Sequence, residues 1–166
     1  MTKREPVDLK DALVRALATS ERINQYLLEH LPADAWSAPP PGGEGRTVAG
    51  IAVHIHNVRH MWLKQQATAE PPPKLDSSAD IQRVGWALAE SYRTLSLVVR
   101  SAMAGDGRVK GHGDVMAFVA YLIAHEAHHR GQIVMMCRLL GHPIPQTAQF
   151  GLWEWSTRDK EARMQF

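Results

Sequence analysis

Cysteine is almost absent from this chain, because Cys137 is the only one among 166 residues. An internal disulfide is therefore excluded, and a single thiol fits a reducing compartment. Long apolar runs are missing too: none reaches the roughly 18 residues that mark a membrane span, and the polar residues 1–6 do not resemble a secretion signal. From these absences we expect a cytoplasmic protein with no membrane partner.

A surplus of one charge is also missing. The chain has 19 basic and 17 acidic side chains, which give a formal net charge of +2 when the histidines are neutral. Proteins that bind nucleic acid usually carry a clear basic surplus or a basic patch. The near balance of charge argues against a nucleic-acid partner.

Apolar residues recur at helical spacing in four long stretches, which turn residues separate. The stretches are residues 8–30, 47–67, 78–103 and 114–140. No stretch has the alternating pattern of a convincing strand, and the chain is long enough for one domain with a sizeable core. We therefore predict an all-α four-helix bundle over about residues 5–141, within a single domain of residues 1–166.

The end of the chain, residues 142–166, lacks this long helical pattern. Pro143 and Pro145 prevent the last helix from continuing, and Trp153 and Trp155 are two of the five tryptophans. We expect an irregular, tryptophan-rich flap on the bundle, with a short frayed helix at its end. Such a flap either covers a cavity or forms a subunit interface.

Three histidines lie within five residues of the last predicted long helix, at positions 125, 128 and 129. His125 and His129 are one turn apart and about 40° apart around the helix axis, so both imidazoles can reach one point. His128 lies about 100° from His129 and cannot easily share that point. The pair can hold a Zn, Ni or Fe ion with at least one more ligand, and the alternative is a solvated histidine cluster.

The helical projection favours the metal over the solvated cluster. His129 projects into the apolar stripe of its helix and His125 lies at the edge of that stripe. A histidine inside a core needs a partner for each nitrogen, which a metal and a hydrogen-bond acceptor would supply. His54 lies at the rim of the apolar stripe of the second predicted helix, and it can meet the pair if the two helices are neighbours.

Other polar side chains of these two helices are assigned by the same projection. Gln132 projects close to His125 and either lines the same cavity or lies on the surface near a subunit boundary. His56 and His60 also have metal-ligand spacing, but they project away from the apolar stripe, so we predict surface histidines. Glu126 projects about 100° from His125, which makes it a poor general base and either a solvated carboxylate or one that supports a ligand. For Cys137 we predict a buried structural thiol.

Two motifs resemble the DinB/YfiT-like family, the DNA-damage-inducible family of small four-helix metalloproteins. The first is His54-Ile55 followed by Trp62, eight positions after the histidine. The second is the run HEAHHRGQ at residues 125–132 near the end of the helical region. The resemblance covers about residues 5–145 and leaves the tryptophan-rich end outside. It implies an up-down-down-up bundle with a long crossover, assembled as a homodimer, which exposed Trp and Met side chains also favour.

The resemblance also implies one divalent metal ion, held by His54, His125 and His129, the same three histidines that the helix faces select. Family members with known activity include thiol-dependent S-transferases and an isomerase that uses low-molecular-weight thiols. It therefore implies a metal-dependent transferase that brings a small thiol to a small-molecule substrate, with the metal activating the thiol or a water molecule. The alternatives are a metal-dependent hydrolase and a non-catalytic, metal-binding stress-response protein. Nucleic acid, suggested only by the family's damage-inducible name, ranks last as a partner.

Overall fold

The computed structural model describes residues 6–66 and 70–166, and its long helices confirm the predicted all-α bundle. The four long helices are α1 Leu9–Glu29, α3 Val48–Leu63, α4 Ile81–Ala104 and α5 Val115–Leu139. Each begins after a short polar side chain that accepts a hydrogen bond from an amide of the first turn, which has no partner within the helix. These capping residues are Asp8, Thr47, Asp80 and Asp114.

The helix limits differ slightly from the prediction. The third predicted helix was expected to begin near Ser78, but the Ser78 amide donates to Asp76 Oδ1 at 2.9 Å in a preceding turn, and α4 begins at Ile81. The second predicted helix was expected to reach about residue 67, but α3 ends at Leu63. Position 67 and residue 5, the predicted start of the bundle, lie outside the described residues.

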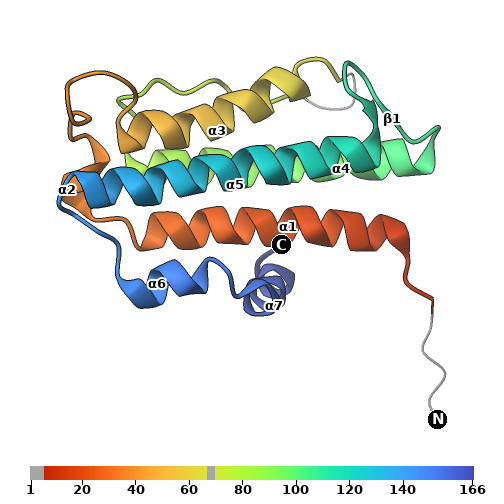
Figure 1. Ribbon diagram of the computed structural model, residues 1–166. Coiled ribbons are helices and arrows are strands. Elements are labelled where there is room, and N and C mark those ends of the chain that lie inside the picture. Colours follow the sequence, from red (N-terminus) through yellow and green to blue (C-terminus); the bar gives the residue numbers. More distant parts are fainter. Residues whose placement is uncertain (1–5, 67–69) are drawn as a thin grey trace, which may run out of the picture.

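The helices have the up-down-down-up order that the resemblance implies. Helices α1 and α5 run in one direction, and α3 and α4 run in the other (Figure 1). Because α3 and α4 are parallel, a long crossover connects them, and its residues 70–80 return along α3 (Figure 1). Helix α3 packs against α4 and α5, and α1 packs against the same two helices. The helix that carries His54 is therefore a neighbour of the helix that carries His125 and His129.

The apolar core has two parts along the bundle. One is built around Leu17, Leu95 and Phe118, and the other around Leu27, Leu88 and Ile133. Between them lie four buried charged side chains, which we call the buried charged layer: Glu21, Arg59, Glu126 and Arg130.

A small hairpin connects α4 to α5, although no strand was predicted from the sequence. Its strands are β1 Arg108–Val109 and β2 Gly113–Asp114, which pair antiparallel. The side chain of Val109 is 3% exposed and belongs to the apolar core, so it anchors the hairpin to the bundle. Two-residue strands are too short to produce a visible alternating pattern in the sequence.

The short helix expected at the end of the chain is present, and the segment before it, which was expected to be irregular, also contains a helix. Besides the four-residue helix α2 Ala33–Trp36, the short helices are α6 Gln146–Gly151 and α7 Trp155–Gln165. Helix α7 packs against α1 (Figure 1). There the Arg158 guanidinium lies 3.9 Å from the centre of the Tyr26 ring, and Arg22 Nε donates to Glu161 Oε2 at 2.8 Å. None of the described helices combines the length and the apolar character needed to cross a membrane.

Candidate metal centre

Three histidines meet where α3 and α5 lie side by side. His54 comes from α3, and His125 and His129 come from successive turns of α5. The ring centre of His54 is 5.4 Å from that of His125 and 4.7 Å from that of His129, and the last two ring centres are 4.4 Å apart. One nitrogen of each ring lies within 4.8 Å of the others. The structure therefore brings together all three histidines selected from the sequence.

The spacing of the nitrogens fits a metal ion. The Nε2 atoms of His125 and His129 are 3.1 Å apart. With metal–nitrogen bonds of about 2.0–2.1 Å, two nitrogens at that separation subtend about 100° at the ion, which suits four-coordinate or six-coordinate geometry. Three imidazole nitrogens that share one point are a donor set that Zn, Ni and Fe all accept.

Gln132 fixes the orientation of one ring. The Nδ1 atom of His129 lies 2.7 Å from Gln132 Oε1, and because an amide oxygen only accepts, Nδ1 carries the proton. The lone pair of His129 is then on Nε2, the atom that faces His125. Gln132 is exposed, and it also lines a cavity of about 470 Å³ whose lining does not include the three converging histidines. Both positions expected for Gln132 therefore stay predictions.

The surroundings keep the three imidazoles in the neutral form that binds metals. Burial lowers the pKa of His54, His125 and His129, and the pKa of His125 falls to about 4. The neighbouring imidazoles add to the effect, as does the positive charge of Arg46 in the loop before α3 for His54 and His129. At neutral pH these rings are therefore unprotonated at the ligand atom.

A cavity lies beside the cluster. Arg46, Ile51 and Gln132 line it, together with His128 and methionines of α5. His54 and His125 are only partly buried, and none of the three converging histidines lines the cavity. His128 lines the cavity but is not one of the three converging rings, as its projection predicted.

Two histidines were placed wrongly from the sequence. His56 is fully buried, with its Nε2 atom 2.9 Å from the carbonyl oxygen of Pro73, and His60 is partly buried, with its Nδ1 atom 2.7 Å from that of Pro72. The crossover covers the face of α3 that the helical projection left to solvent. His56 and His60 are therefore not surface histidines, and they hold the crossover in place.

Glu126 is not a solvated carboxylate. It is 1% exposed, and its Oε1 accepts from Arg59 Nε at 2.7 Å while its Oε2 accepts from Asn24 Nδ2 at 2.8 Å. Arg59 also lies 2.7 Å from Glu21 Oε2, in an ion pair that joins α3 to α1. The buried charged layer was not predicted from the sequence, although Glu21 and Glu126 lie on the apolar faces of their helices, where a charged residue indicates a buried ion pair. Cys137 is buried, as predicted.

Comparison with known families gives two overlapping matches. A sequence profile described as the DinB superfamily matches residues 16–133, and one described as the DinB family matches residues 109–163. The second match extends into α7, so the tryptophan-rich end does not lie outside the resemblance. No curated protein and no solved structure matches the chain.

Proposed function

The chain belongs to the DinB superfamily, and from this membership and the histidine cluster we propose that it is a metal-dependent enzyme. His54, His125 and His129 would hold one divalent ion through the three ring nitrogens that lie within 4.8 Å of one another. This convergence is the observation that carries the proposal. Three protein ligands leave coordination positions open, as in catalytic sites, whereas structural zinc sites are closed by four.

When bound, such an ion acts as a Lewis acid and lowers the pKa of a coordinated thiol or water. The reaction that we propose is transfer of a low-molecular-weight thiol to a small electrophilic substrate. Gln132 would hold the His129 ring in the productive orientation, and the positive charge of Arg46 at the rim would attract an anionic thiol. A cavity of about 470 Å³ is within the usual size range for a small-molecule site.

The first test is elemental analysis of untagged protein purified without chelator. We expect close to one divalent ion per chain in the wild type and loss of that ion in His54→Ala and His129→Ala. His128→Ala is the matched control, because His128 is exposed on the same helix and lies outside the cluster. Metal that is absent from the wild type, or that persists in both ligand variants, would contradict the ligand set.

The second test separates catalysis from a structural ion. We expect the metal-loaded wild type to accelerate the reaction of a small thiol with an aryl halide, and His54→Ala to lose this acceleration. If the ion is bound but neither thiol transfer nor ester hydrolysis is accelerated, the protein is a non-catalytic metal-binding protein. Removal of a purely structural ion should then lower the melting temperature by several degrees for each kcal/mol lost. The identity of the metal, the homodimer and the cytoplasmic location stay predictions.

A further inference from the structure

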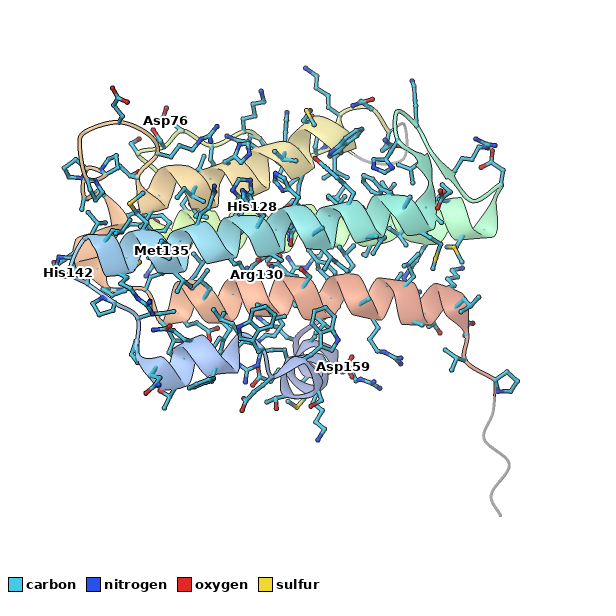
Figure 2. All side chains as sticks on the ribbon, viewed as in Figure 1. Asp76, His128, Arg130, Met135, His142 and Asp159 are labelled. Atoms are coloured by element: carbon cyan, nitrogen blue, oxygen red, sulfur yellow. The ribbon has the colours of Figure 1, made fainter. Side chains whose placement is uncertain are left out.

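A second cavity, of about 500 Å³, lies on the other side of α5 from the histidine cluster. Its α5 lining includes Ala127, Arg130 and Val134, which project roughly opposite to His125 on a helix with about 100° per residue. Figure 2 shows His128 on the α3 side of α5 and Arg130 on the α1 side. The C-terminal segment from α6 into α7 forms the wall opposite α5. This cavity and the one beside the histidines share Gly131 and Met135 of α5, but none of the three converging histidines lines this one.

The walls of this cavity are apolar and aromatic. Ile123 and Val134 of α5 face Leu152, Trp153 and Trp155 of the C-terminal segment across it. Trp153 is 86% exposed. A large apolar side chain that is this exposed at the mouth of a concave site is typical of a surface that a ligand covers.

The floor of the cavity carries a positive charge with unused hydrogen-bond donors. The side chain of Arg130 is 9% exposed, and its Nη1 donates to Asn24 Oδ1 at 2.6 Å and to Ser20 Oγ at 3.3 Å. Its ion pair with Glu126 is long, at 3.9 Å. Among the described residues no hydrogen bond is formed by Nε or Nη2 of Arg130, so one edge of the guanidinium remains available.

The charges around Arg130 leave room for an anion. Glu126 is already paired with Arg59 at 2.7 Å, and Glu126 is the only acidic residue of α5. Burial and the positive charge of Arg59 lower the pKa of Arg130, whereas Glu126 and Glu21 raise it. At the rim, Arg138 Nη2 donates to Gln149 Oε1 at 3.3 Å, and within the described part of the chain no carboxylate pairs with Arg138.

We propose that this cavity binds an amphipathic monocarboxylate, such as a medium-chain fatty acid or an arylalkanoic acid. The carboxylate would accept two hydrogen bonds from the Nε and Nη2 edge of Arg130, the fork geometry that suits this group. The apolar body would lie between Val134 and the Trp153–Trp155 segment. Arg138 would add a second positive charge at the rim.

The test is calorimetric titration of the full chain with decanoate below its micelle concentration, with decanol as the neutral ligand of equal length. We expect one decanoate per chain and at least tenfold weaker binding of decanol. Ala127→Phe should abolish binding because the ring fills the cavity, while Ala120→Phe, at an exposed position of α5 outside the lining, should bind like the wild type. Arg138→Gln should weaken decanoate severalfold and leave decanol unchanged.

Three results would overturn the proposal. Equal affinity for decanoate and decanol would show that the cavity does not recognise the negative charge of the carboxylate. Loss of decanoate binding in His54→Ala would place the ligand at the histidine cluster instead. The third result is the absence of decanoate binding, together with a wild-type dimer in analytical sedimentation that Ala127→Phe converts to a monomer. The cavity would then be part of a contact between two copies of the chain. Because Arg130→Gln removes a buried charge and can unfold the bundle, the conclusion rests on the Ala127 and Arg138 variants.

Discussion

Gln132 illustrates how much of the candidate site depends on a single side chain. Its Oε1 accepts the proton of His129 Nδ1 at 2.7 Å, and no other group was found bonded to that nitrogen among the described residues. Without this acceptor the His129 ring can rotate or change tautomer, and its lone pair no longer points at His125. The orientation of the His129 ring is therefore set by Gln132, which is not one of the three converging histidines.

From this contact we predict that Gln132→Leu weakens metal binding by about 10–100-fold, the usual cost of losing such a partner. Competition with a chelating dye measures the affinity. Gln82→Leu, at an exposed position of α4, is the control and should bind metal like the wild type. An unchanged affinity in Gln132→Leu would mean that the His129 ring is held by packing alone.

At the scale of elements, the crossover between α3 and α4 is attached to α3 by polar side chains. Besides the two histidines, Asn57 donates from Nδ2 to the Leu75 carbonyl at 2.9 Å and accepts the Leu75 amide at 3.0 Å. This pair of bonds replaces the backbone partners that an extended, proline-rich segment cannot provide for itself. It explains why the outer face of α3 is polar and yet covered.

We predict that Asn57→Ala increases hydrogen exchange of the Leu75 amide by up to about tenfold, because each lost hydrogen bond contributes about 0.5–1.5 kcal/mol. Exchange of amides inside α5 should not change. Hydrogen–deuterium exchange read by mass spectrometry on short peptides measures both. Faster exchange across the whole bundle would instead indicate that Asn57 stabilises the global fold.

The elements also show what could be predicted from the sequence. Helical periodicity is a local property, so four helices, their approximate limits and the inward faces of His125 and His129 follow from it. His56 was assigned to the surface because the projection describes one helix and cannot show that the crossover returns over it. The last helix was expected to be frayed, because its own pattern cannot show that distant partners, such as Tyr26 beneath Arg158, stabilise α7.

At the scale of the whole molecule, Arg59 connects all four long helices. From α3 it reaches Glu21 of α1 and Glu126 of α5, each at 2.7 Å, and its Nη1 donates to the Leu88 carbonyl of α4 at 2.9 Å. Its side chain is 1% exposed, so these contacts are made away from water. Removal of Arg59 alone would leave two buried carboxylates without their main partner.

We therefore predict that Arg59→Met lowers the free energy of unfolding by about 3–5 kcal/mol, as expected when one member of a buried ion pair is lost. Arg100→Met is the control, because Arg100 pairs with Asp11 at an exposed site, where such a change costs at most about 1 kcal/mol. Urea unfolding followed by circular dichroism measures both. Equal losses in the two variants would mean that water reaches the buried charged layer.

The buried charged layer has a further consequence for how the helices are aligned. A bundle held only by aliphatic side chains tolerates a helix that slides along its neighbour by one turn, about 5.4 Å, since one leucine replaces another. In this protein the same shift would move Arg59 away from the carboxylates of Glu21 and Glu126. Charged groups would then be buried without a partner, which is costly. The buried charged layer therefore favours a single axial register of the helices. In that register of α3 against α5, His54 lies beside His125 and His129.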